Sequence, residues 1–402
     1  MGEASSIILG FATQTSAMQD FPGHLTSKLP DVGTTIFTVI SREAQACGAI
    51  NLAQGFPDFS ADTPLFDAVA SHMRAGRNQY SPMTGQPALR EAVAQKMRAV
   101  YGADYDAEEE ITITAGATQA VYTAITAFAG PGDEVIVFEP AFDSYLPGIR
   151  LAGATPVFVR LEAPRFLPDW EVVARCITPR TRLIITNTPH NPTGAAWSMD
   201  DQRALARLCD GRDIVVISDE VYEHIVFDGR AHASAARLPE LAARTVLVSS
   251  FGKTFHVTGW KVGFVCAPAA LSAEFRRVHQ FNVFAVNTPC QLGLADYLTE
   301  PSRYLELGRF YQAKRDAFRA GLAGSRFELP DCAGTYFQLA SYRAISDEPD
   351  QSFVRRLMRE AGVAAIPVSA FHHDGHDARL IRFCFAKTEA VIAQAIERLR
   401  AY

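Results

Sequence analysis

The sequence predicts an α/β protein in which helices wrap a mainly parallel sheet, joined to a smaller α+β region. Strand-like and helix-like segments alternate from about residue 65 to 300, a pattern typical of a parallel sheet covered by helices. The 402 residues also exceed the roughly 250 to 300 that a single hydrophobic core usually organises. Two domains are therefore expected.

Turn residues separate the predicted elements. GPGD at 130–133 divides a helix-like run from the strand-like EVIVF. A charged, helix-favouring stretch from about 301 to 324 then leads into a region with three strand-like segments, GTYFQLA, VAAIPV and LIRFCF. We therefore assign residues 65–300 to a large domain and 301–402 to a small one.

Composition and charge exclude several classes of function. A net charge of −6 argues against a nucleic-acid partner bound through a broad positive surface. No apolar run reaches the roughly 18 residues that a membrane-spanning helix needs. The opening MGEASSIILGFA has no basic flank and too short an apolar core for a signal peptide. We expect a cytoplasmic protein that binds neither nucleic acid nor membrane.

The cysteines also indicate a reducing compartment. They are scattered, odd in number and free of CxxC pairs. We expect all of them to be buried free thiols. They are Cys47, Cys176, Cys209, Cys266, Cys290, Cys332 and Cys384.

Lys253 is the most informative single residue. It lies in SSFGKTFHVTGWKVGF at 249–264, directly after the strand-like TVLV, and only six of the 38 basic residues are lysines. A desolvated amine can lose its proton and attack a carbonyl, which a guanidinium cannot do. The position therefore favours an aldehyde cofactor, pyridoxal phosphate. Most lysines are instead solvated surface charges, and GKT at 252–254 is not a P-loop, because Leu247 stands where that motif needs glycine.

Two upstream segments end in polar turns in the same way. RLIITNTPHNPTG at 182–194 and DIVVISDEVYEH at 213–224 are buried strand-like runs that deliver Asn191, Asp219 and Tyr222 at their carboxyl ends. Ligands of open α/β sheets bind beyond these ends, so the three side chains can meet Lys253 in one cleft.

Each residue type suits a pyridine-ring cofactor. Asp219 would keep the ring nitrogen protonated, which makes the ring an electron sink. Tyr222 and Asn191 can donate to its phenolate oxygen, while Ser250 and Lys261 offer a hydroxyl and a cation to the phosphate. Taken singly, each residue has a better explanation than cofactor binding. Asp219 would cap a strand end, Asn191 would belong to a β-turn, Tyr222 would pack in the core and Lys261 would be a surface charge. Their combination favours the cofactor.

The combination resembles a known family. NPTG at 191–194, SDEVY at 218–222 and SFGK at 250–253, with Lys261 eight residues further on, are similar to the class I and II aminotransferases that bind pyridoxal phosphate in the aspartate aminotransferase fold. The similarity runs from LAQGFPDF at 52–59 to IRFCFAK at 381–387. It is greatest to the branch of methionine aminotransferases and kynurenine aminotransferases, or cysteine-conjugate β-lyases.

The resemblance implies a pyridoxal-phosphate-dependent transferase fold in which residues 1–64 join the small domain. It also implies that the AGATQA segment, with Gly116, Ala117 and Thr118, cradles the phosphate at a helix start. An ordinary N-cap at Thr118 is the alternative for that segment. Phe142 would stack on the pyridine face. On its own it would be assigned to the core.

Further roles come from the same resemblance. Tyr80 would reach the phosphate of the neighbouring subunit's cofactor in a homodimer with shared active sites, and Thr288 would act similarly. Arg382 would grip the substrate carboxylate through a bidentate pair. Gly55 would belong to a loop that closes over the substrate, where a side chain would obstruct it. Phe284 would lie near the substrate.

The expected reaction is a ping-pong transamination. Lys253 would anchor the cofactor and move the α-proton, Asp219 would stabilise the charge that develops, and Arg382 would orient the substrate. We expect a large neutral amino donor, with methionine first and aromatic amino acids next, and a 2-oxo acid acceptor. The segment 281–289 has no Arg or Lys for a second carboxylate. Contacts with Phe284, Tyr336 and Phe337 would stabilise a bound donor whose side chain is a thioether or an aromatic ring.

Three alternatives stay open. A kynurenine aminotransferase or cysteine-conjugate β-lyase would use the same residues, although Ala285 stands where kynurenine aminotransferases have His. A non-enzymatic regulator would need a DNA-binding domain, and the roughly 50 residues before AQGFPDF are too few and too uncharged for one. HHDGH at 372–376 has metal-ligand residue types but lacks HExxH spacing. We expect a solvated loop at the mouth of the site and no metal.

Overall fold

The computed structural model describes residue 21 and residues 23–402. In this part of the chain a seven-stranded sheet has the order β2-β8-β7-β6-β5-β3-β4. Every pairing is parallel except the two that β8 makes with β2 and β7. The strands are β2 (Ile111–Thr114), β3 (Glu134–Glu139), β4 (Thr155–Arg160), β5 (Thr181–Asn187), β6 (Val215–Asp219), β7 (Thr245–Ser250) and β8 (Gly263–Cys266). The predicted α/β class with a mainly parallel sheet is confirmed.

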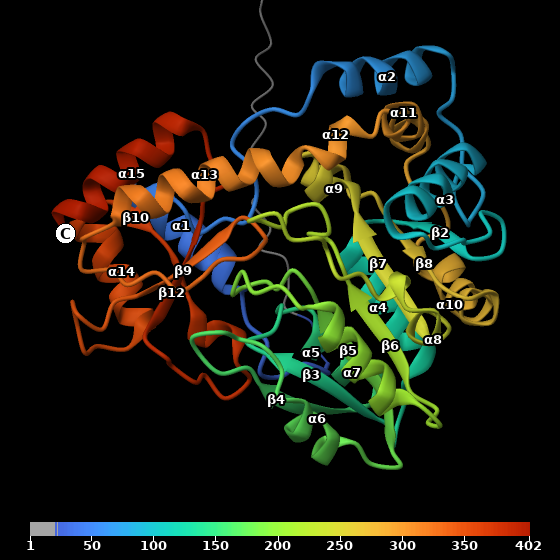
Figure 1. The fold of residues 1–402 in the computed structure, drawn as a ribbon, viewed down its shortest axis with the longest axis horizontal. Coiled ribbons are helices and arrows are strands. Elements are labelled where there is room, and N and C mark those ends of the chain that lie inside the picture. Colours follow the sequence, from blue (N-terminus) through green and yellow to red (C-terminus); the bar gives the residue numbers. More distant parts are fainter. Residues whose placement is uncertain (1–20, 22) are drawn as a thin grey trace, which may run out of the picture.

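Helices cover both faces of this sheet, as Figure 1 shows. Successive strand residues point to opposite faces, so Ile217 packs in one core while its neighbour Val216 packs in the other. This is why the central strands are continuous apolar runs. One face carries α4 (Ala117–Phe128), α5 (Tyr145–Ala152) and α10 (Ala269–Asn282), and the other carries α6 (Trp170–Cys176), α7 (Met199–Cys209) and α8 (Pro239–Ala242).

Further helices flank the antiparallel side of the sheet. They are α2 (Thr63–Arg74), α3 (Pro87–Tyr101), the short α9 (Phe251–Thr254), α11 (Thr288–Leu298) and α12 (Ser302–Leu305). The α2 and α11 helices pack so closely that a Cβ on Gly293 would lie 2.4 Å from Cγ2 of Val69. Single 3-10 turns are η1 (Ala235–Arg237), η2 (Thr258–Trp260) and η3 (Val368–Phe371).

A second group of elements gathers beside the large sheet (Figure 1). The antiparallel sheet β11-β12-β9 forms its centre, and β1 pairs in parallel with β10. Its elements are α1 (Ile36–Cys47), β1 (Ile50–Asn51), α13 (Leu307–Leu322), β9 (Phe337–Ser341), α14 (Asp350–Glu360), β10 (Val363–Ala364), β11 (Ile366–Pro367), β12 (Leu380–Cys384) and α15 (Glu389–Ala401). Early and late parts of the chain therefore lie side by side. The domain limits at residues 64 and 300 stay a prediction.

The expectation that all seven cysteines are buried is wrong in part. Cys47 is exposed and Cys176 is partly exposed, whereas the other five cysteines are buried as expected. Among the described residues no helix is long and apolar enough to cross a membrane. The signal-peptide question concerns residues 1–12, which lie outside the described part of the chain.

Candidate active site

A cavity of about 150 Å³ lies beyond the carboxyl ends of β5, β6 and β7. This is the edge at which open α/β sheets bind ligands. Most of the predicted site residues line it: Gly116, Ala117, Thr118, Phe142, Asn191, Asp219, Tyr222, Ser250, Lys253 and Lys261. We call this cavity the cofactor pocket. Sequence reasoning missed four further lining residues, Val121, Asn187, Val221 and Thr258.

Lys253 lies in the short helix α9, which β7 delivers to the pocket. Its Nζ donates to the hydroxyl of Tyr336 at 3.1 Å and to the carbonyl oxygen of Gly55 at 3.5 Å. Burial lowers the pKa of Lys253 to about 8, and the positive charges of Arg382 and Lys261 act in the same direction. A neutral amine is therefore much more accessible here than on a solvated lysine, as a nucleophile requires.

Asp219 is the last residue of β6 and lines the cofactor pocket. Its Oδ2 accepts a hydrogen bond from Tyr145 at 2.6 Å, and its Oδ1 accepts the backbone N–H of Val221 at 3.3 Å. Burial raises the pKa of Asp219 to about 6, against these hydrogen bonds and the charge of Lys253. The contact of Tyr145 with Asp219 was not predicted from the sequence. The one sequence feature that points to Tyr145 is its position three residues after Phe142, where α5 begins.

The start of helix α4 forms one end of the pocket. Gly116 is its N-cap at φ 79°, so the alternative that Thr118 is the N-cap is wrong. A Cβ on Gly116 would lie 3.3 Å from Cε of Lys261, which keeps the lysine close to the free N–H groups of the helix. Helix N–H groups with a cation beside them attract an oxyanion. Ser250 and Thr258 add hydroxyl groups to the same wall.

Arg382 lies on β12, and its side chain joins the small sheet to the cofactor pocket. One of its terminal nitrogens donates to Oδ1 of Asn191 at 2.7 Å, and the other donates to the carbonyl oxygen of Ala53 at 3.3 Å. The guanidinium carbon lies 3.9 Å from the centre of the Phe337 ring. Its Nε has no partner among the described residues. Burial lowers the pKa of Arg382 to about 10. A buried cation with free donors fits a carboxylate ligand.

Gly55 lies where a side chain would collide with this arrangement. A Cβ there would come within 2.9 Å of Cζ of Phe337 and 4.0 Å of a terminal nitrogen of Arg382. The carbonyl oxygen of Gly55 accepts the Tyr336 hydroxyl at 2.7 Å, so this loop is tied to the residue that contacts Lys253.

A larger cavity of about 940 Å³ adjoins the cofactor pocket and shares Thr118, Phe142 and Lys261 with it. His372 and His373 are among its lining residues. The expectation that HHDGH is a solvated loop is wrong for His372, which is only 9% exposed. The ring of His373 stacks on Phe158 at 3.8 Å between ring centres, and its Nδ1 lies 2.8 Å from Oε2 of Glu139. The loop is therefore packed against the large sheet.

Three predicted residues lie outside both cavities and close to one another. Tyr80 is 80% exposed and Phe284 is 61% exposed, and their rings meet edge to face with 5.0 Å between centres. The Thr288 hydroxyl contacts the residues on either side of Tyr80, the carbonyl oxygen of Gln79 at 2.6 Å and the hydroxyl of Ser81 at 2.7 Å. The roles of Tyr80 and Thr288 at a partner's site stay a prediction, and so does the contact of Phe284 with the substrate, although Phe284 lines neither cavity of its own chain.

Comparisons with known proteins agree with this geometry. The family model for aminotransferase class I and II matches residues 48–399. A methionine aminotransferase from Escherichia coli (strain K12) is 53% identical over 375 residues, which cover 93% of this chain and 97% of that protein. Kynurenine–oxoglutarate transaminase 1 from Rattus norvegicus is 34% identical, and the match covers 93% of this chain and 97% of that protein.

Solved structures give the same result. An Escherichia coli structure for which a methionine aminotransferase function was identified has a TM-score of 0.93 at 52% identity, covering 95% of this chain and 100% of that one. An N-succinyldiaminopimelate aminotransferase from Mycobacterium tuberculosis has a TM-score of 0.90 at 39% identity, covering 94% and 100%. This chain belongs to the class I and II aminotransferases.

Proposed function

We propose that this aminotransferase works with pyridoxal phosphate and moves the amino group of a large neutral amino acid to a 2-oxo acid. Methionine is the donor that fits best, and aromatic amino acids come next. The observation that carries the substrate class is the composition of the site. Arg382 is buried among aromatic rings with unused donors, and the adjoining larger cavity, although it also has charged residues in its wall, includes the rings of Phe142, Phe158 and Phe371.

The pocket residues fit the cofactor. The amide groups at the start of α4, with Lys261 and Ser250, suit its phosphate. Asp219 suits its ring nitrogen, and Phe142 suits the face of the ring. When bound, pyridoxal phosphate supplies an electron sink for the pair released at the α-carbon.

The protein's own groups then position the substrate and move its proton. Arg382 binds the α-carboxylate, and Asn191, already hydrogen-bonded to Arg382, fixes the guanidinium plane. This orientation places the α-hydrogen toward Lys253. The amine of Lys253, with its lowered pKa of about 8, takes the α-proton as general base and returns a proton as general acid.

The walls of the larger cavity favour uncharged donors. Asp143 lines it and has no ion-pair partner among residues 23–402, and burial raises the pKa of this carboxyl. Arg150 also lines the cavity, but its guanidinium lies 3.9 Å from Asp31. A second substrate carboxylate would therefore meet a carboxyl group and no uncommitted arginine. Leaving it unpaired would cost several kcal/mol.

The kinetic test compares methionine, phenylalanine and aspartate against one common 2-oxo acid. We expect kcat/KM for methionine to be highest and that for aspartate to be roughly a thousandfold lower. Asp143→Asn is the matched variant, and it should raise kcat/KM for aspartate while leaving that for methionine nearly unchanged. A kcat/KM for aspartate equal to or above that for methionine would refute the proposed donor class.

The cofactor is tested separately. The purified protein should be yellow, and borohydride should fix the cofactor to the wild-type chain but not to Lys253→Ala. Lys314→Ala is the control, because Lys314 is buried but contacts the carbonyl oxygen of Lys387 at 2.8 Å, away from the cofactor pocket. Persistence of the reduced link in Lys253→Ala would show that another lysine is the anchor.

A kynurenine aminotransferase or cysteine-conjugate β-lyase is the second candidate, supported by the rat relative. Release of pyruvate and ammonia from a cysteine conjugate without any 2-oxo acid would identify lyase activity. We further propose a homodimer in which Tyr80, Phe284 and Thr288 serve the partner's site. Tyr80 and Phe284 are exposed outside this chain's own cavities, and the buried Thr288 supports the Tyr80 segment through its hydrogen bonds to Gln79 and Ser81. A cytoplasmic location is proposed from the unpaired cysteines.

A further inference from the structure

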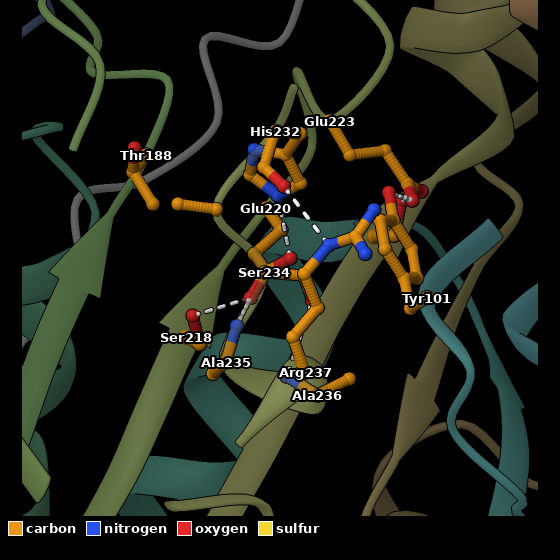
Figure 2. Close-up of polar contacts among 12 residues, drawn as sticks. Tyr101, Thr188, Ser218, Glu220, Glu223, His232, Ser234, Ala235, Ala236 and Arg237 are labelled. Atoms are coloured by element: carbon orange, nitrogen blue, oxygen red, sulfur yellow. Dashed lines mark hydrogen bonds and ion pairs between the residues drawn. The ribbon is translucent and has the colours of Figure 1, made fainter. Parts of the chain in front are cut away.

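A third cavity, of about 600 Å³, lies behind the turn that carries Asp219 and Tyr222. It shares no lining residue with the cofactor pocket. The next two residues of that turn, Glu223 and His224, line it, together with Tyr101 at the end of α3. Figure 2 shows Tyr101, Glu223, His232 and Arg237 gathered at this place. We call it the rear cavity. Its volume is that of a small-molecule site.

Two hydrogen bonds hold the guanidinium group of Arg237 in place at the wall of the rear cavity. Its Nε donates to the carbonyl oxygen of His232 at 3.3 Å, a contact drawn in Figure 2, and a terminal nitrogen donates to that of Val100 at 2.9 Å. The guanidinium carbon lies 5.1 Å from the centre of the Tyr101 ring. A guanidinium has five N–H donors, so the group is oriented while most of its donors stay unused. This is the preorganisation that an oxyanion site needs.

The charges around Arg237 leave an excess of cations at the rim. Arg230 and Arg309 also line the cavity, are exposed, and have no ion-pair partner among the described residues. The carboxylates in the wall of the cavity, Glu223 and Asp316, already have cationic partners. Glu223 accepts Lys96 at 2.6 Å as well as the hydroxyls of Tyr101 and Ser249, and Asp316 lies 2.7 Å from Arg315.

His224 is a buried residue in the wall of the rear cavity. It is only 8% exposed, and its Nε2, which lies 3.7 Å from Oε2 of Glu223, has no hydrogen-bond partner among the described residues. Burial lowers the pKa of His224 to about 3, so the ring adds no charge to the wall. The cations that face the cavity are therefore the three arginines.

We propose that the rear cavity binds a small molecule through an oxyanion group, a carboxylate or a phosphate. Arg237 binds the oxyanion, and Arg230 and Arg309 attract it at the rim. The site is separate from the transamination site, where Arg382 binds the substrate carboxylate.

Titration calorimetry on the cofactor-loaded enzyme tests this proposal with two probes, malonate and inorganic phosphate, at constant ionic strength. We expect at least one probe to bind with a Kd on the order of 1 mM. Arg237→Gln should weaken that binding by about tenfold or more. Arg382→Gln should retain it, which separates the rear cavity from the substrate site. Arg207→Gln should also retain it, because Arg207 is an exposed arginine outside the cavity.

The two probes also identify the ligand. Binding of malonate alone indicates a carboxylate ligand, and binding of phosphate indicates a phosphate ligand. If Arg237→Gln folds poorly, Arg309→Gln replaces it, since the Arg309 side chain makes no hydrogen bond within the described residues. The absence of saturable binding of either probe, or equal binding in the wild type and the rear-cavity variants, would overturn the proposal.

Discussion

Tyr145 donates a hydrogen bond to Oδ2 of Asp219 across 2.6 Å, and both side chains are buried. Burial raises the pKa of Asp219 to about 6, while the hydrogen bond from Tyr145 acts in the opposite direction. The ionised carboxylate is the form that pairs with a protonated ring nitrogen. Tyr145 therefore stabilises the charge state in which Asp219 works and also fixes its direction.

Tyr145→Phe should weaken catalysis most at low pH. Loss of the hydrogen bond raises the pKa of Asp219 further, so the acid limb of the kcat/KM profile should move to higher pH. A hydrogen bond to a charged group contributes about 1.5–3 kcal/mol, so we expect a loss of roughly tenfold or more near pH 6 and a smaller loss near pH 8. Tyr105→Phe is the control, because the buried hydroxyl of Tyr105 has no hydrogen-bond partner within residues 23–402. An unshifted acid limb would contradict the assigned role.

Tyr336→Phe should lower kcat more than it raises KM. The Tyr336 hydroxyl lies 3.1 Å from Nζ of Lys253 and donates to Gly55 at 2.7 Å, so it positions the amine that moves the proton. We expect about a tenfold fall in kcat. Tyr311→Phe is a close control: Tyr311 is equally buried, its ring centre is 5.6 Å from that of Tyr336, and its hydroxyl has no hydrogen-bond partner in the part of the chain that the structure describes. Equal effects of the two changes would mean that Tyr336 only fills space.

The contacts of Tyr145 and Tyr336 could not be predicted from the sequence. The strand ends that carry Asp219 and Lys253 were predicted, because apolar runs that break into polar turns are visible within one short segment. The contact of Tyr145 with Asp219 spans 74 positions, and that of Tyr336 with Gly55 spans 281. No local pattern encodes such a pairing. Tyr145 meets Asp219 because α5 and β6 belong to the same large sheet region, and Tyr336 meets Gly55 because early and late parts of the chain lie side by side.

The rear cavity was missed for a related reason. Glu223 and His224 belong to the same run as Asp219 and Tyr222, so the motif was assigned to one site only. Lys96, which pairs with Glu223, lies 127 positions away on a helix with an ordinary amphipathic pattern. The exposure of Tyr80, in contrast, agrees with the predicted role in another subunit, whereas the exposure of Phe284 was not predicted.

The desolvated amine of Lys253 makes the stability of the cofactor-free protein depend on pH. The pKa of Lys253 falls from 10.5 to about 8 on folding. Below pH 8 the amine is charged in both states, and its burial destabilises the fold by up to about 3 kcal/mol. Between pH 8 and 10.5 the unfolded state binds more protons, so this penalty disappears as the pH rises.

Lys253→Met should therefore be more stable than the wild type at pH 7 and lose that advantage by about pH 10.5. Urea unfolding of both cofactor-free proteins across this range measures the difference. A difference that does not change with pH would show that the amine of Lys253 is well solvated in the folded state.

The ion pair between Lys96 and Glu223 should behave as a coupled unit. Its atoms lie 2.6 Å apart in the interior. Burial opposes ionisation of Glu223, yet Lys96, with His224 and Ser249, holds the pKa of this carboxyl below its usual value. Lys96→Met should cost about 3–5 kcal/mol of unfolding free energy, since it leaves a buried charge unmatched. The double variant with Glu223→Gln should cost less than the sum of the single changes. Additive costs would contradict the coupling.

Mixed dimers test whether the active sites are shared. Tyr80 and Phe284 contact each other on the surface and lie outside both cavities of their own chain, so they are placed to complete a site on a second copy. Tyr80→Phe and Lys253→Ala subunits should each form weakly active or inactive homodimers. In a hybrid dimer one site receives Lys253 from one subunit and Tyr80 from the other, so both intact residues meet there. Mixing should restore activity toward one intact site per hybrid.

Tyr122→Phe replaces Tyr80→Phe in the control, because Tyr122 is a partly exposed tyrosine in the wall of this chain's own cavity. A fully active monomer, or no recovery on mixing when exchange of subunits is demonstrated, would show that each chain completes its own site.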